Sequence, residues 1–214
     1  MVRPSSAALR AKGPAPGRDS GTRARLLEAA VEVFAGRGFR EGTLREICQR
    51  AGANVAAVNY HFRSKERLYL QVLRDAFLRL KAEHPLEPSP TPPAGIEEAR
   101  ARLREVVGRL AASILGTRPS TDALLLFREM IEPTVALDRL VAEFIRPRFE
   151  ALEGALSPFF AGRDERTLVL HTLSVLGQLV YYRCAGPVAL RLLGERAFTP
   201  SLVEAIVDHV VGFT

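Results

Sequence analysis

Phosphate contact is the chemistry that best matches the residues from Thr43 to Lys65. The stretch Thr43-Leu-Arg-Glu46 is a capping box, in which Thr43 caps a helix and Glu46 reaches back to the amide of Thr43. Because helix N-termini attract anions, Thr43 and the amides that follow it are placed to bind a phosphate as well as to cap the helix. Lys65, in the first turn of a later helix, is the best single candidate for a phosphate contact.

A short helix between these two positions carries side chains that can contact the edges of bases. Asn54 is a good N-cap for this helix, which is expected to run to about Tyr60. Small apolar side chains can contact thymine methyl groups, and Asn59 can pair with adenine. Val58 and Phe62 are expected to anchor the helix in a core. If this helix enters a nucleic-acid groove, the residues expected to contact it are Asn54, Val55, Ala56, Ala57 and Asn59.

No set of side chains indicates catalysis or metal binding. The sequence has no Gly-rich phosphate loop, no nucleophile elbow and no HExxH motif. We therefore predict no enzyme activity, no catalytic residue, no metal site and no cofactor. The histidines are dispersed and lack the spacing of metal ligands: they are His61, His84, His171 and His209.

Charge is distributed unevenly along the chain. Residues 1–80 hold 15 Lys and Arg against 7 Asp and Glu, whereas residues 81–214 hold 15 against 17. A basic part joined to a near-neutral part is typical of proteins that bind nucleic acid or an acidic membrane surface. No apolar run approaches the roughly 18 residues that a membrane span needs, and the N-terminus lacks the apolar region of a signal peptide. The two distant cysteines, Cys48 and Cys184, indicate a reducing compartment, so we expect a cytoplasmic protein without a membrane partner.

The elements that must position these residues are helical. Residues 1–20 are rich in Pro, Gly, Ala and Arg, and are predicted to be a flexible basic arm. The arm could contact DNA, or it could be a disordered tail without a role. Apolar spacing and capping residues then predict helices from Thr22 to Gly36 or Gly38, from Leu44 to Ala51, from Val55 to Tyr60, and from Lys65 to Lys81 or His84.

The second half of the chain is predicted to be helical as well. A Pro-rich connector covers residues 85–95, and Pro147 is expected to kink or break the helix that contains it. No segment alternates like a strand, so the predicted fold class is all-α, with about nine helices. The later helices are predicted over 96–115, 122–131, 135–156, 165–184, 187–193 and 200–213.

The N-terminal pattern resembles the TetR family of bacterial regulators. The matching stretches are TRARLLEAAVEVFAGRGF, TLREI, AG and NYHFRSKERL, between Thr22 and Leu68. The resemblance implies a three-helix, helix-turn-helix DNA-binding domain over 21–68 and a dimer whose third helices enter successive major grooves of a palindromic operator. It also implies that Tyr60 and His61 contact the DNA backbone. The third helix lacks the early lysine of many relatives, so specificity is expected to depend on DNA shape as well.

The C-terminal part, 69–214, is predicted to be a helical bundle that binds an effector and forms the dimer. A polar stripe on one apolar helix, at His171, Ser174, Gln178 and Tyr181 or Tyr182, could line a ligand pocket or lie in a dimer interface. Residues 127–140 and 177–183 resemble the CerR/CecR-type subgroup, which implies an effector cavity and a dimer made by 164–184 and 200–213. The candidate ligand residues are Phe127, Met130, Thr134, His171, Gln178 and Tyr182, with ordinary core packing as the alternative for each.

These patterns together predict a ligand-responsive, sequence-specific DNA-binding regulator, with repression as the default implied by the family resemblance. The alternatives are an architectural DNA-binding protein without an effector, a small helical enzyme, and a protein that binds a membrane surface through its basic arm. An enclosed apolar pocket in the C-terminal part would argue against the architectural alternative.

Overall fold

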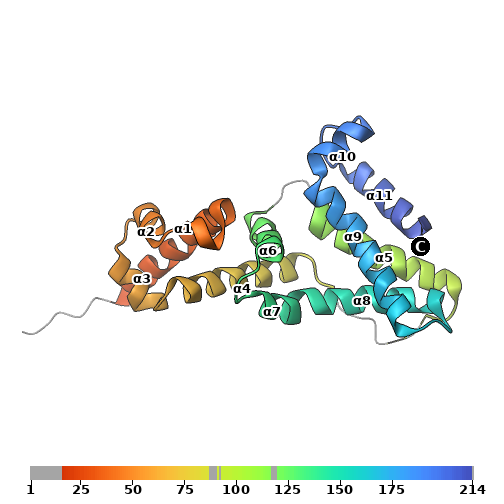
Figure 1. Cartoon of the computed structure of the whole chain (residues 1–214), viewed down its shortest axis with the longest axis horizontal. Helices are drawn as coiled ribbons and strands as arrows, with labels where there is room; N and C mark the ends of the chain where they lie inside the picture. The colour runs from red at the N-terminus through yellow and green to blue at the C-terminus, as the bar shows by residue number, and fades with distance from the viewer. Residues whose placement is uncertain (1–15, 87–90, 92, 117–119, 214) are drawn as a thin grey trace, which may run out of the picture.

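The part of the chain that the structure describes is helical and contains no strand, as the sequence predicts. The structure is a computed structural model, and it describes residues 16–86, 91, 93–116 and 120–213. The molecule is elongated (Figure 1), with α1–α3 at one end, α9–α11 at the other, and α4 and α6 between them.

The N-terminal head consists of α1 (Pro16–Glu41), α2 (Leu44–Ala51) and α3 (Val55–Phe62). The helix of α1 begins at Pro16, before the predicted start at Thr22, so residues 16–20 are helical and do not belong to a flexible arm. The remainder of the predicted arm, residues 1–15, lies outside the described residues. Gly38 interrupts the helical conformation with a φ of 76°, and Gly52 ends α2 in the left-handed region, as predicted.

The head shares one apolar core with α4 (Lys65–Glu83) and α6 (Thr121–Ile131). Phe34, Leu68 and Leu125 are fully buried in this core, although they come from three different parts of the chain. Ser64 caps α4 by accepting a hydrogen bond from the amide of Arg67. Because α4 and α6 both pack in the core of the head, a movement of either helix would move the head relative to the rest of the molecule.

The body contains α5 (Ile96–Leu115), α9 (Glu165–Cys184), α10 (Gly186–Leu193) and α11 (Pro200–Phe213), together with one long interrupted helix. That helix consists of α7 (Leu137–Leu140), a wider turn η1 (Val141–Ile145) and α8 (Arg146–Leu156). Near Pro147, where a kink or break is predicted, the structure has a wider π turn: the amide of Arg146 bonds to the carbonyl of Val141, five residues earlier, and the backbone at both ends of this turn stays helical. A short 3₁₀ turn, η2 (Ser157–Phe160), follows α8.

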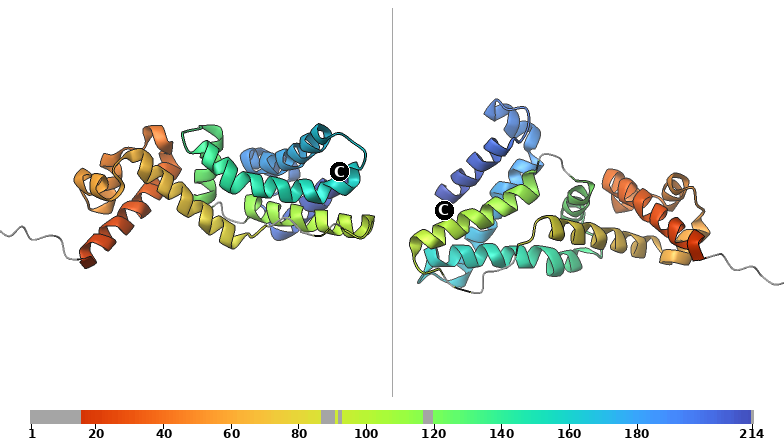
Figure 2. Two further views of the ribbon diagram at one scale, coloured as in Figure 1. Left: turned by 90° about the horizontal axis from the view of Figure 1, so that it is seen from below. Right: turned by 180° about the vertical axis from the view of Figure 1, so that it is seen from behind.

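The body has a second apolar core, in which α5 is covered by α8, α9 and α11. Leu103, Leu152, Leu179 and Val210 are buried there, one from each of these helices. Figure 2 shows from below and from behind that this bundle and the head occupy opposite ends of the long axis. None of the described helices is long and apolar enough to cross a membrane.

Candidate nucleic-acid interface and candidate effector site

Thr43 forms the predicted N-cap of α2. Its backbone is extended, and its Oγ1 accepts a hydrogen bond of 3.1 Å from the amide of Glu46. The other half of the predicted capping box is wrong, because the carboxylate of Glu46 instead pairs with Arg37 and Arg50, each at 3.2 Å. The pair with Arg37 joins the first turn of α2 to α1, whereas the pair with Arg50 lies within α2. Thr43 itself is exposed.

The helix α3 presents one face to solvent and packs the other against the head. Val58 and Phe62 are buried, which confirms that they anchor the helix. Ala57, predicted to contact DNA, is instead half-buried against the core. Among the predicted contacts, the structure leaves Asn54, Val55, Ala56, Asn59 and Tyr60 exposed on the outer face.

The side chain of Asn54 caps the N-terminus of α3. Its Oδ1 accepts a hydrogen bond of 2.9 Å from the amide of Ala57, so this oxygen caps the helix. Asn59, one turn further on, is exposed, and its carboxamide makes no hydrogen bond to any described residue. Of the two asparagines, Asn59 therefore has the side chain that can pair with a base.

Lys65 and the neighbouring aromatic side chains lie at the start of α4 and the end of α3. The Lys65 Nζ donates to the carbonyl of Arg40 at 3.2 Å and lies 4.7 Å from the centre of the Phe39 ring. These contacts hold Lys65 against α1, so any contact with phosphate would be additional to a structural role. The rings of Tyr60 and His61 pack edge to face at 5.0 Å, with Tyr60 exposed over 68% of its surface.

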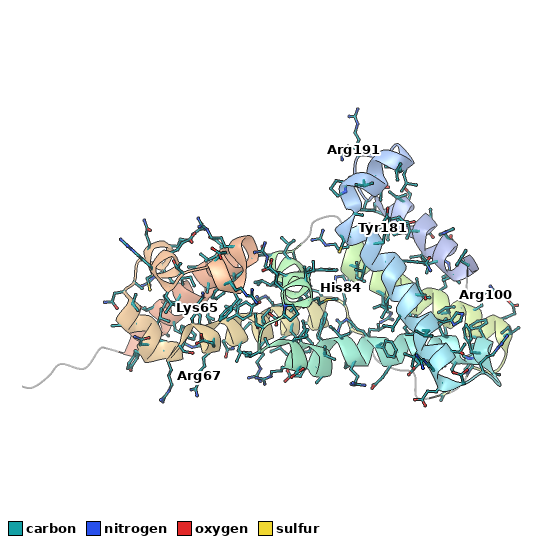
Figure 3. All side chains as sticks on the ribbon, viewed as in Figure 1. Lys65, Arg67, His84, Arg100, Tyr181 and Arg191 are labelled. Carbon is teal, nitrogen blue, oxygen red and sulfur yellow. The ribbon has the colours of Figure 1, made fainter. Side chains whose placement is uncertain are left out.

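Three arginines that the sequence analysis did not name lie in α2, directly after α3 and in the first turn of α4. Arg45, Arg63 and Arg67 are exposed and form no ion pair with the rest of the described chain. Figure 3 labels Arg67 at the edge of the head, near Lys65. Arg63 follows α3 directly and is the single described non-glycine residue with a positive φ, 70°. Their positions in the first turns of α2 and α4 and just after α3 were visible in the sequence and could have identified them.

A buried polar cluster lies behind this surface, where α4 meets α6. The carboxylate of Glu129 has no exposed surface and accepts hydrogen bonds from the Tyr69 hydroxyl and the Thr134 amide, both at 2.8 Å. The Thr134 hydroxyl also donates to Glu129 at 2.9 Å. Burial and the neighbouring Glu129 carboxylate raise the pKa of Tyr69 well above its usual range.

The six candidate ligand residues do not meet in one cavity. Thr134 is engaged with Glu129, Phe127 lies 5.5 Å from the guanidinium of Arg183, and Met130 is exposed. His171 packs against Phe160, with ring centres 4.3 Å apart. Gln178 and Tyr182 are the two that share a cavity, the groove described next.

A groove of about 560 Å³ runs along the outer side of the body, between α9 and α11. It is lined by Ser174, Gly177, Gln178, Tyr181, Tyr182, His209 and Phe213. Most of the polar stripe predicted on this helix therefore lies on the surface of the single chain, where Figure 3 labels Tyr181. A smaller, mainly apolar crevice of about 30 Å³ lies between α4, α7 and η1.

Comparison with known proteins covers both parts of the molecule. Residues 26–72 match the family described as bacterial regulatory proteins, tetR family. Residues 99–214 match the C-terminal domain of the HTH-type transcriptional dual regulator CecR. The chain is 28% identical to the CecR protein of Shigella flexneri over 189 residues, which span 85% of this chain and 84% of that one.

Solved structures share the fold. A member of the TetR transcriptional regulator family from Streptomyces coelicolor A3 superposes with a TM-score of 0.58 at 20% identity, covering 88% of this chain and 90% of the other. A transcriptional regulator from Rhodococcus sp. Rha1 gives a TM-score of 0.57 at 20% identity, covering 89% and 94%. At these identities the agreement concerns the arrangement of helices.

Proposed function

Since the chain belongs to the TetR family of bacterial regulatory proteins, with a C-terminal domain of the CecR type, we propose that it is a homodimeric, effector-responsive repressor. Each protomer would place α3 in the major groove of one half of a palindromic operator. Operator DNA lies in the cytoplasm of a bacterium, and the protein would act there.

The exposed face of α3 is the observation that carries this proposal. A short helix held by buried Val58 and Phe62 leaves Val55, Asn59 and Tyr60 exposed. Arg63 follows the helix directly and has no ion-pair partner in the described chain. A helix of this width fits the major groove, and cations at its flanks suit the phosphates on either side. The capped N-terminus of α2 at Thr43 adds a further place for a phosphate.

Dimer formation is supported by the surface of α9 and α11. Leu170, Leu173 and Tyr181 on α9, and Phe213 on α11, each expose more than half of their surface. Apolar side chains gathered along two long helices favour burial against another protein surface. A second copy presenting the same two helices would cover the groove of Tyr181, Tyr182, His209 and Phe213 and would form a four-helix interface.

The effector is proposed to act through α6, because this helix touches both parts of the molecule. Its Asp122 forms an ion pair of 2.7 Å with Arg79 of α4, and its Phe127 lies beneath Arg183 of α9. A ligand that favoured one position of α6 would therefore change the placement of the head relative to the dimer interface.

Selection of duplexes from a random-sequence DNA pool, followed by affinity measurements on the selected duplex over a range of salt concentrations, tests DNA binding. We expect a sequence to be enriched and its affinity to fall steeply with added salt. Arg67→Ala is expected to lower the affinity and to reduce the salt slope by about one unit, because one phosphate contact is lost.

Glu83→Ala serves as the matched control, since Glu83 is an exposed residue at the far end of α4 and should leave both values unchanged. Failure to enrich any sequence at low ionic strength, with a protein that retains its helical content, would contradict the proposed function.

A further inference from the structure

We infer that the operator half-site presents A·T pairs to α3, read through a thymine methyl group at Val55 and an adenine at Asn59. This inference rests on the proposed function and adds the base composition of the site. Three observations support it: Val55 and Asn59 are exposed, the oxygen of Asn54 is engaged in capping the helix, and α3 has no Lys, Arg, Asp or Glu side chain.

The helix α3 offers no guanidinium, ammonium or carboxylate group to a base edge. All eight residues of the helix are described, and its sequence VAAVNYHF contains no Lys, Arg, Asp or Glu. The groups that pair most specifically with guanine, a guanidinium or an ammonium, are therefore absent from this helix, as is the carboxylate that accepts from cytosine. The exposed arginines Arg45, Arg63 and Arg67 lie before and after α3 in the chain and are not part of this helix.

Val55 is the apolar contact of this face. It is exposed over 44% of its surface at the first position of α3, and Ala56 beside it is exposed as well. A guanine or an adenine facing these methyl groups would lose water from its N7 without gaining a donor, which is costly. A thymine would instead bury its own methyl group against Val55, which is favourable by roughly four-fold in affinity per methyl group.

Asn59 supplies the hydrogen-bonding contact. Its carboxamide has no partner in the described chain, whereas the oxygen of Asn54 is engaged in capping the helix. A carboxamide can donate to N7 and accept from the N6 amino group of adenine at the same time, an arrangement that no other base offers in the major groove. Val55 and Asn59 are one turn apart, and four residues of helix advance about 6 Å, close to two base-pair steps.

Modified bases test both contacts on the duplex selected by the wild-type protein. Uracil in place of the central thymines removes only the methyl groups, and 7-deazaadenine removes only the N7 acceptor. We expect uracil to weaken wild-type binding about four-fold for each methyl group lost. We expect a smaller factor for Val55→Ala, because alanine keeps only one of the contacting methyl groups of Val55. Similarly, 7-deazaadenine should weaken binding by the wild type about ten-fold but should not affect Asn59→Ala.

Arg67→Ala is the control for these comparisons, because a protein lacking a phosphate contact should lose the same factor on every duplex. A selected site with G·C pairs at its protected centre, or equal binding of the thymine and uracil duplexes by the wild type, would overturn the inference and leave DNA binding intact. The selection of duplexes comes before the modified-base measurements. If it enriched no duplex, the inference and the proposed function would both be overturned.

Discussion

At the scale of single residues, Glu129 shows how a buried carboxyl group is accommodated where α4 meets α6. Its carboxylate is fully buried, and neutral donors on Tyr69 and Thr134 hydrogen-bond to its oxygens. Removing one donor leaves a buried carboxylate short of a partner, which costs more than the hydrogen bond contributes. The cluster therefore favours one relative position of α4 and α6.

Tyr69 gives a prediction about alkaline pH. Its pKa is raised in the folded protein, so the unfolded chain loses the tyrosine proton first as the pH rises through about 10. The stability tied to this proton is fully present below that pH, and the free energy of unfolding should fall above it by up to about 1.4 kcal/mol per pH unit.

Urea unfolding between pH 9 and about pH 11 measures this slope, with the reference pKa of tyrosine near the middle of the range. Tyr69→Phe is expected to remove this contribution and also to lower stability near neutral pH by about 1–3 kcal/mol. Tyr60→Phe, at a position exposed over 68% of its surface, is the matched control. An unchanged slope in Tyr69→Phe would show that another group causes the alkaline loss.

Sequence reasoning could find the caps but not this cluster. The side-chain oxygens of Thr43 and Asn54 each accept a hydrogen bond from an amide three residues later, so the signal lies within one turn of the chain. Tyr69 and Glu129 are separated by 60 residues, and nothing local indicates that they meet. Thr134, a candidate ligand residue, lies only five residues from Glu129, and its hydroxyl donates a hydrogen bond to that carboxyl group.

At the scale of elements, the boundaries of the helices were largely predictable, and their contacts were not. Pro200 at the first position of α11 and the apolar spacing of α5 gave the observed bounds. The helix α1 begins at Pro16, six residues before the predicted start at Thr22. Residues 16–21 include Pro and Gly, which disfavour helix, so their composition did not indicate the observed start. The sequence of α6 does not indicate that this helix packs in the core of the head, because its apolar face could pack equally well in the core of the body.

Gly38 provides a test at the scale of elements. It has a φ of 76°, and a Cβ atom added there would lie 2.8 Å from the Arg128 side chain of α6. Gly38→Ala should therefore destabilise the protein by about 1–3 kcal/mol through backbone strain and the displaced arginine. It should also weaken DNA binding by loosening the head from α6.

Gly36→Ala is the matched control two residues earlier. Its added Cβ would meet nothing within 4 Å, and the position is helical. This substitution should stabilise the protein by about 0.5–1 kcal/mol. Thermal unfolding of both variants makes the comparison, and equal effects of the two substitutions would contradict the special role of Gly38.

At the scale of the whole molecule, two cores are joined by α4, α6 and the long α7–α8 helix. The head and the body each bury their own apolar residues. This division suits a protein whose recognition helix must move relative to a fixed dimer interface. The resemblance to a regulator family identified that plan from the sequence, whereas the exposed groove between α9 and α11 required the arrangement in space.

Leu173 tests the dimer interface. It lies on α9 and is exposed over 51% of its surface, and a charge there would be buried against the second copy. Leu173→Glu is therefore expected to convert the dimer to a monomer, as measured by light scattering on the eluting protein. Leu78→Glu places the same change on α4 at 49% exposure and should remain dimeric. A dimeric Leu173→Glu protein would place the interface elsewhere.

Hydroxyl-radical footprinting on the selected duplex tests the central claim most directly, namely that two copies of α3 are held at the spacing of one DNA turn. The account predicts two protected patches related by two-fold symmetry, with centres about 10 base pairs apart. A single protected patch without symmetry, or uniform protection along the whole duplex, would contradict this claim.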